Sequence, residues 1–202
     1  MDSRIPERRS NSMTPSIAMT SLRRKSILQQ SSGYIELGEL LVEADKPTPL
    51  AAQKLLLRAL ELLNQLPEPT RSKPTAKLLE GEALRSLGRW EPAIDSLQLV
   101  VQEAPHQTQA WLGMGWCLKR LGRLDEAIAI LEQGLVASPK QPILHYNLAC
   151  YCSLAGGVQA AIDHLTQAIA VDVRFRDLTA IERDFDPIRT DPRFVQATLL
   201  TA

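Results

Sequence analysis

Histidine and cysteine are the residues of this chain with the widest chemical range, and their spacing bears on catalysis and metal binding. His106, His145 and His164 lie far apart, so none has the histidine four residues away that a helical zinc site needs. Cys150 and Cys152 are two positions apart, which on a helix directs their side chains about 200° apart and away from a shared metal. We therefore expect neither a metal site nor a redox site from these residues.

Motifs for nucleotide binding and nucleophilic catalysis are also missing from the sequence. No G-x-x-x-x-G-K-[ST] loop occurs, and Gly156-Gly157 follows no strand-like segment, so this pair does not resemble a phosphate-binding loop. No G-x-S-x-G motif occurs either. Because the sequence offers no constellation of polar groups that would carry a reaction, we expect a chain that is not an enzyme and needs no cofactor.

The composition indicates a soluble helical protein. Of the 202 residues, 45% are apolar and only 4% aromatic, which is thin for a β-sandwich and ordinary for helices built on Leu and Ala. Three cysteines cannot form a fully paired set of intrachain disulfides, which favours a reducing compartment. No apolar run approaches the roughly 18 residues of a membrane span, and the N-terminus lacks the apolar stretch of a secretory signal. We therefore expect a cytoplasmic location.

Charge is divided unevenly along the chain. Lys and Arg number 23, as do Asp and Glu, but residues 1–30 carry six basic and two acidic side chains. This segment is rich in Ser, Arg and Gln and has no sustained apolar period, so we expect a disordered basic tail. Its thinly spread basic residues have no interleaved aromatics, and the rest of the chain is acidic. A nucleic acid or an anionic membrane is therefore not the favoured partner.

From residue 31 onward, apolar residues recur at intervals of three and four, a pattern that predicts paired amphipathic helices. The first pair is expected over 34–44 and 49–66, with a proline-containing turn between the helices. Each of three further pairs turns around a glycine: Gly88, Gly122 and Gly156. Glycine adopts a left-handed cap conformation at little cost, so these turns are expected to end the first helix of each pair.

A 34-residue period runs through these hairpins. Small or turn-forming residues recur at this spacing in four columns: Gly81, Gly115 and Ala149; Gly88, Gly122 and Gly156; Ala93, Ala127 and Ala161; Pro105 and Pro139. A small residue in the middle of a first helix lets its partner helix approach closely, where a large one would force the pair apart. One hairpin cannot bury its apolar stripe alone, so neighbouring hairpins must stack to create the core.

The pattern resembles the tetratricopeptide repeat family, whose unit is a 34-residue helical hairpin. The resemblance covers 74–107, 108–141 and 142–175, and extends more loosely over a degenerate first hairpin and linker at 31–73. The middle unit matches best, at these signature positions: Trp111, Gly115, Leu118, Gly122, Ala127 and Pro139. The resemblance implies an all-α, right-handed α-solenoid of antiparallel helix hairpins.

The last segment, 176–202, is expected to be a C-terminal cap, because Pro187 falls where the first helix of a further repeat would still be running. We expect a short helix near 176–183 and a turn at Asp186-Pro187. A last helix would follow, with Asp191 as its N-cap and Pro192 as its first residue. Together these elements would cover the open apolar end of the stack.

The family resemblance also implies a concave groove formed by fixed positions of each first helix. The candidate groove residues are: Leu78, Glu82, Arg85, Leu112, Trp116, Lys119, Arg120, Tyr146 and Cys150. The same mapping places Glu39, Gln109 and Ile143 on this surface. An aromatic residue beside basic ones suits a peptide with an apolar anchor and an acidic group, because Trp and Arg are frequent interface hot spots. The family's carboxylate clamp is absent, since leucine or tyrosine replaces its first lysine.

These observations predict a non-enzymatic protein–protein interaction module that binds a peptide or partner segment in a concave groove. The alternative is a small secretion or assembly chaperone that holds an apolar partner segment. In either case we expect a monomer or a weak dimer. The repeats do not identify the partner, because specificity resides in a few groove residues rather than in the scaffold.

Overall fold

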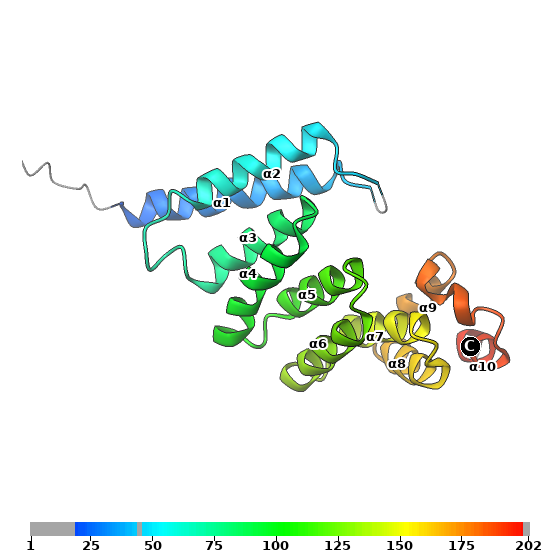
Figure 1. Cartoon of the computed structure of the whole chain (residues 1–202). Coiled ribbons are helices and arrows are strands. Elements are labelled where there is room, and N and C mark those ends of the chain that lie inside the picture. The colour runs from blue at the N-terminus through cyan, green and yellow to red at the C-terminus, as the bar shows by residue number, and fades with distance from the viewer. Residues whose placement is uncertain (1–18, 44–45, 200–202) are drawn as a thin grey trace, which may run out of the picture.

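The computed structural model describes residues 19–43 and 46–199, and in these ranges every regular element is a helix. The helices are: α1 (Ser21–Glu39), α2 (Leu50–Leu63), α3 (Pro74–Ser86), α4 (Trp90–Glu103), α5 (Thr108–Arg120), α6 (Leu124–Ala137), α7 (Pro142–Leu154), α8 (Val158–Val171), α9 (Arg174–Thr179), the 3₁₀ helix η1 (Arg183–Ile188) and α10 (Pro192–Leu199). Helices α1 to α8 pack one after another as antiparallel pairs that stack into an arc (Figure 1). The predicted all-α solenoid is confirmed.

The sequence period reappears in the helix boundaries. The first helices α3, α5 and α7 begin 34 residues apart, as do the second helices α4, α6 and α8. Each pair turns at a glycine with positive φ: Gly88 (75°), Gly122 (74°) and Gly156 (78°). In the first turn the Arg89 amide donates to the Leu84 carbonyl at 2.9 Å, which closes a Schellman motif that needs the left-handed residue. The glycines that recur every 34 residues therefore mark the ends of the first helices α3, α5 and α7.

Glycines inside the first helices allow close helix contact. A Cβ placed on Gly81 would lie 2.6 Å from the side chain of Leu97 on α4, and one on Gly38 would lie 2.9 Å from Leu56 on α2. Both distances are shorter than carbon atoms tolerate, so these helices pack at a separation that a larger residue would prevent. Ala93, fully buried on α4, supplies the small residue from the opposite side.

Helix α1 is longer than predicted at its N-terminal end. It begins at Ser21, so the prediction that the disordered basic tail extends to residue 30 is wrong for residues 21–30; residues 1–18 lie outside the described residues. Ile27, Ser31 and Ile35 form its buried face, where the Ser31 hydroxyl donates to the Ile27 carbonyl at 2.9 Å. The sequence concealed this helix because a serine occupies the buried stripe and basic residues and glutamines cover the exposed one.

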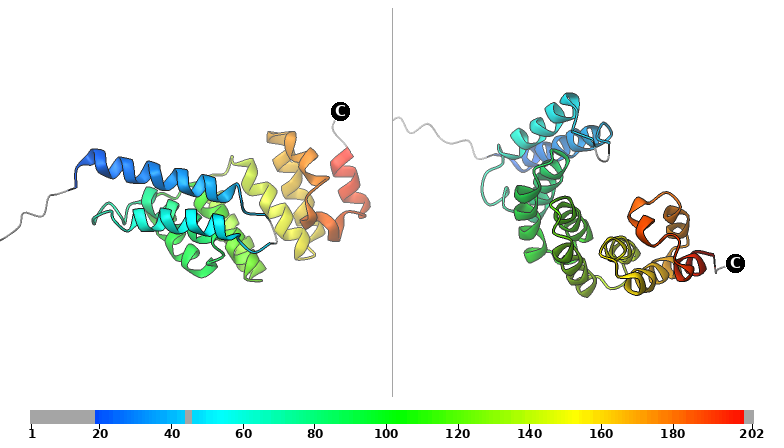
Figure 2. Two further views of the ribbon diagram at one scale, coloured as in Figure 1. Left: turned by 90° about the horizontal axis from the view of Figure 1, so that it is seen from above. Right: turned by 45° about the vertical axis from the view of Figure 1, so that its right-hand side comes forward.

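After α8 the chain folds back into the inner side of the arc, as the right-hand view of Figure 2 shows. Helix α9 ends at Thr179, short of the helix expected to 183, and the expected turn at Asp186-Pro187 lies within η1. Helix α10 begins at Pro192 as predicted, and the Asp191 carboxylate accepts a hydrogen bond from the Arg193 amide at 2.9 Å. Helix α10 packs on α8, whereas η1 packs on α7.

Candidate functional site

Three cavities on the concave side meet at the indole of Trp116, which lies on α5. The tryptophan cavity, about 310 Å³, is lined by: Glu39, Val42, Glu43, Lys46, Thr48, Arg85, Ser86, Trp90, Trp116 and Arg120. The Glu82 cavity, about 390 Å³, is lined by: Glu39, Glu82, Arg85, Leu97, Gln109, Leu112, Gly113, Trp116, Ile143 and Asn147. The C-terminal cavity, about 730 Å³, is lined by: Lys46, Trp116, Lys119, Arg120, Ile181, Glu182, Arg183 and Asp184. Trp116 is therefore central to the concave surface.

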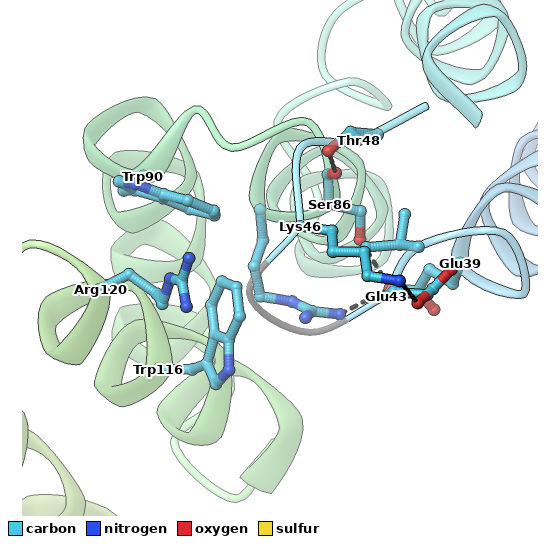
Figure 3. A pocket seen from close by; sticks show the side chains of 10 residues that line it. Glu39, Glu43, Lys46, Thr48, Ser86, Trp90, Trp116 and Arg120 are labelled. Atoms are coloured by element: carbon cyan, nitrogen blue, oxygen red, sulfur yellow. Dashed lines mark hydrogen bonds and ion pairs between the residues drawn. The ribbon is translucent and has the colours of Figure 1, made fainter. Parts of the chain in front are cut away.

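The tryptophan cavity is built around two indoles and two guanidinium groups. The rings of Trp90 and Trp116 meet edge to face, with centroids 5.1 Å apart and planes at 73°. The Arg85 guanidinium lies 5.3 Å from the Trp116 centroid, and that of Arg120 lies 5.7 Å from Trp90 and 5.6 Å from Trp116. Figure 3 shows these indoles with Arg120 on one side of the cavity and Glu39, Glu43 and Lys46 on the other. Cation–π contacts hold the aromatic rings in place.

Trp90 is one of the cavity-lining residues that the sequence mapping missed. It is the first residue of α4, the second helix of its unit. The mapping took positions from first helices only, so a residue just after the hairpin turn fell outside it. The sequence does hold a feature that could have identified Trp90. This residue lies two positions after Gly88, next to a hairpin turn, and Trp116 and Arg120 lie near the corresponding turn of the next unit.

Two of the predicted basic groove residues are already paired inside the chain. Arg85 Nη2 lies 2.6 Å from Glu39 Oε1, and the Ser86 hydroxyl donates to the same carboxylate at 2.8 Å. Lys119 forms an ion pair with Asp184 of η1 and lies 5.5 Å from the Tyr151 ring centroid. These pairs neutralise part of the basic cluster that the sequence suggested as a site for an acidic ligand.

Glu82 has the opposite surroundings. Its carboxylate is partly buried in the Glu82 cavity and forms no hydrogen bond or ion pair with other described residues. Burial raises its pKa, the negative charges of Glu39 and Glu36 on α1 raise it further, and Arg85 lowers it. Leu112 and Ile143 add apolar side chains to the lining of the cavity, and Gln109 and Asn147 add side-chain amides. This carboxylate is therefore a polar group with unused capacity to accept hydrogen bonds.

The concave surface of the fourth unit, α7–α8, is covered by the chain itself. Tyr146 and Cys150 are 6% and 3% exposed, so the prediction that they line an open groove is wrong. The Tyr146 ring centroid lies 5.0 Å from that of Phe175 and 5.8 Å from that of Phe185, which is fully buried. The C-terminal segment therefore fills this part of the groove and buries Phe175 and Phe185 against Tyr146.

Leu78, the remaining predicted groove residue, packs partly buried against the hydrophobic core and lines none of the three cavities. Leu112 lines the Glu82 cavity, as does Arg85. Lys119 and Arg120 line the C-terminal cavity. The structure therefore gathers Glu82, Arg85, Leu112, Trp116, Lys119 and Arg120 on one surface and removes Leu78, Tyr146 and Cys150 from it.

The structure also brings together two histidines that the sequence left apart. His145 Nδ1 on α7 lies 3.1 Å from His164 Nδ1 on α8, and burial lowers the pKa of both imidazoles. His106 is separate, with Nδ1 2.8 Å from the Ala137 carbonyl oxygen. In the described part of the chain no three metal-ligating side chains gather at one point. Cys117 is buried, and its pKa is raised to about 12 by that burial.

None of the described helices is long and apolar enough to cross a membrane. Residues 84–149 match a family model described as tetratricopeptide repeat. The chain is 28% identical over 120 residues to human tetratricopeptide repeat protein 33, an alignment that covers 59% of this chain and 44% of that protein. The chain therefore spans less than half the length of this curated relative.

Solved structures extend the likeness to most of the chain. TTC0263, a thermophilic TPR protein of Thermus thermophilus, superposes with a TM-score of 0.57 at 20% identity, covering 88% of this chain and 100% of that one. MamA RS-1 gives a TM-score of 0.56 at 17% identity, covering 77% and 78%. MamA AMB-1 gives 0.53 at 20% identity, covering 80% and 97%. At these identities the likeness shows a shared fold.

Proposed function

We propose that this chain, which resembles tetratricopeptide repeat proteins over residues 84–149 and in its fold, acts as an interaction scaffold whose concave groove binds an extended segment of a partner protein. The single observation that carries this proposal is the position of Trp116, whose indole is shared by three adjoining cavities. A large aromatic side chain that is only partly buried, at the centre of a concave surface, is the usual form of a binding hot spot.

The scaffold would contribute by holding the groove in its binding conformation before the partner arrives. Trp116 stands on α5, in the middle of the stack, and contacts Trp90 and Arg85 from the preceding unit. Fixed rings lose little conformational freedom when a ligand packs against them, so more of the contact energy remains as affinity. An apolar side chain of the partner segment would be the anchor beside these indoles.

The proposal is tested by selecting random dodecapeptides displayed on phage against the full chain and measuring the binding of selected peptides by titration calorimetry. Trp116→Ala is expected to weaken binding at least tenfold, because it removes the surface on which the anchor packs. Val136→Ala is the matched control, since Val136 is 86% exposed and lies outside the three cavities. If no peptide is selected, or if Trp116→Ala binds as well as the control, the groove assignment is wrong.

A chaperone for an apolar partner segment is the second candidate, and exposed leucines of the first hairpin favour it. Leu37, Leu40 and Leu50 are 55%, 81% and 74% exposed and lie near the turn between α1 and α2. If this function holds, co-expression should keep an otherwise insoluble protein encoded beside this chain in solution. The effect should be lost when Leu40 and Leu50 are changed to serine and kept with Trp116→Ala. The opposite pattern would assign the activity to the groove.

A further inference from the structure

On the concave surface, two basic side chains have carboxylate partners, whereas one carboxylate has no basic partner among the described residues. The basic residues Arg85 and Lys119 have carboxylate partners, Glu39 at 2.6 Å and Asp184, supplied by α1 and by η1. Glu82 on α3 has no such partner among the described residues, although it lies between helices and is only partly accessible. The surface therefore presents an unsatisfied negative group where the sequence had suggested a site for an acidic ligand.

Leaving a carboxylate partly dehydrated without a counter-charge costs free energy, and a cationic ligand would remove that cost. Glu39 and Glu36, on the neighbouring helix α1, add negative potential at Glu82. Arg85 opposes it, but the Arg85 guanidinium is bound to Glu39 and lies over the Trp116 ring, so it does not itself pair with Glu82. The local sum of Glu82, Glu39 and Arg85 is one negative charge.

The lining of the Glu82 cavity suits a long aliphatic chain with a charged end. Its volume is about 390 Å³, and Leu112 and Ile143 line the same cavity as the Glu82 carboxylate. Lysine and arginine side chains bury their methylene stems on apolar surface while the cationic head reaches a polar group. The side-chain amides of Gln109 and Asn147 lie at the same cavity and can bind further polar groups of the ligand.

We propose that the Glu82 cavity binds a lysine or arginine side chain of the partner segment. This inference rests on the function proposed above and deepens it by naming the chemistry that the groove selects. Because the Glu82 cavity and the tryptophan cavity share Trp116, Arg85 and Glu39, the basic residue and the apolar anchor of the partner lie close together in one short segment.

The test uses the random dodecapeptide library selected against the full chain at about pH 7. We expect the selected peptides to share a lysine or arginine close to a bulky apolar residue. One such peptide and its variant with norleucine in place of the basic residue are then titrated against wild type, Glu82→Gln and Glu80→Gln. Glu80 is the matched control, because it lies on the same helix, pairs with Lys77 at 2.5 Å and lines none of the three cavities.

The four affinities of wild type and Glu82→Gln for the two peptides form a double-mutant cycle. Norleucine in the peptide should weaken binding to wild type about tenfold, as expected for a partly desolvated charge pair. Glu82→Gln should weaken binding of the basic peptide by a similar factor and leave the affinity for the norleucine peptide unchanged. Glu80→Gln should change neither affinity. Selection against Glu82→Lys should replace the basic residue with an acidic one.

Two results would overturn the inference in distinguishable ways. If selected peptides depend on Trp116 but carry no basic residue, or bind Glu82→Gln as tightly as wild type, the charge assignment is wrong and the groove function stands. If no selected peptide depends on Trp116, the groove function and the charge assignment are both wrong.

Discussion

The ammonium of Lys119 on α5 forms an ion pair with the carboxylate of Asp184 on η1, 65 residues later in the chain. Both side chains are mostly shielded from water, at 26% and 15% exposed. Since η1 also packs on α7, this pair fastens the C-terminal segment to two consecutive repeats from the inner side of the arc. The boundary of the open groove therefore depends on this contact.

Removing the Asp184 carboxylate should loosen η1. Asp184→Asn is expected to destabilise the segment by about 1–2 kcal/mol, because it leaves the Lys119 charge partly buried without its partner. Asp186→Asn is the matched control, since Asp186 pairs with Arg189 at 2.9 Å in an exposed position, where ion pairs contribute about 0–1 kcal/mol. Hydrogen exchange of the η1 amides measures the difference. Equal exchange in the two variants would contradict the assigned role of the Lys119–Asp184 pair.

Phe185→Ala should uncover the fourth unit. Phe185 is fully buried against Tyr146 and Phe194, so the substitution is expected to cost about 3–5 kcal/mol. Cys150, 3% exposed beneath this segment, should then react faster with a thiol-specific maleimide, which mass spectrometry of digested protein can locate. Ile181→Ala in the same segment is the control, because Ile181 is 79% exposed. Unchanged labelling of Cys150 in Phe185→Ala would show that η1 does not shield it.

Two glycines of first helices should respond to alanine with opposite signs. Gly81→Ala places a Cβ 2.6 Å from Leu97 and should destabilise the protein by about 1–3 kcal/mol. Gly33→Ala meets nothing within 4 Å and should stabilise α1 by up to about 1 kcal/mol, because alanine favours a helix more than glycine does. Thermal unfolding of both variants tests this contrast. A rise in Tm with Gly81→Ala would mean that α3 and α4 do not need their close approach.

The His145–His164 contact should make stability depend on pH. Burial lowers the pKa of both imidazoles, and the positive charge of His164 lowers that of His145 further; Glu132 on α6 and Asp163 on α8 act in the opposite direction on His164. With folded-state pKa values below the unfolded ones, the unfolded chain binds more protons. The histidine contribution to stability is therefore complete above about pH 6.5 and declines as pH falls through the folded-state values.

His164→Gln should flatten this dependence, because it removes one of the two titrating rings and keeps a polar side chain between α7 and α8. The measurement is the midpoint of urea unfolding at about pH 7.5 and about pH 5, relative to wild type. His106→Gln is the control, because His106 is exposed and does not contact the His145–His164 pair. This variant should keep the wild-type pH dependence. If acidification lowers the urea midpoint of His164→Gln as much as that of wild type, the two histidines do not cause the pH dependence.

Features that repeat locally could be predicted from the sequence. The 34-residue spacing of Gly88, Gly122 and Gly156 predicted the hairpins, because helix periodicity and left-handed caps depend on residues a few positions apart. The expected groove position of Trp116 came instead from the family resemblance, and in the structure this residue lines all three cavities. The start of α1 was missed because Ser31 lies on its buried face. An amphipathic pattern is recognised from apolar residues, so a buried serine interrupts it.

Contacts between distant elements could not be predicted. Nothing in the sequence near Tyr146 indicates that Phe185 covers it, or that Lys119 and Arg85 have acidic partners on η1 and α1. These pairings depend on how the chain returns after the last repeat and on the curvature of the whole stack. The sequence therefore indicated where the cations of the groove lie, but the net charge that a ligand meets emerged only from the three-dimensional arrangement.

A stack of helical hairpins is elastic, because each hairpin contacts mainly its neighbours and small rotations add along the array. The C-terminal segment changes this mechanical behaviour at one joint. Since η1 packs on α7 and is tied through Asp184 to α5, straightening the arc between these two repeats must separate an ion pair and expose buried phenylalanine. A short segment outside the repeats thus stiffens the array and holds the groove at one width at that end.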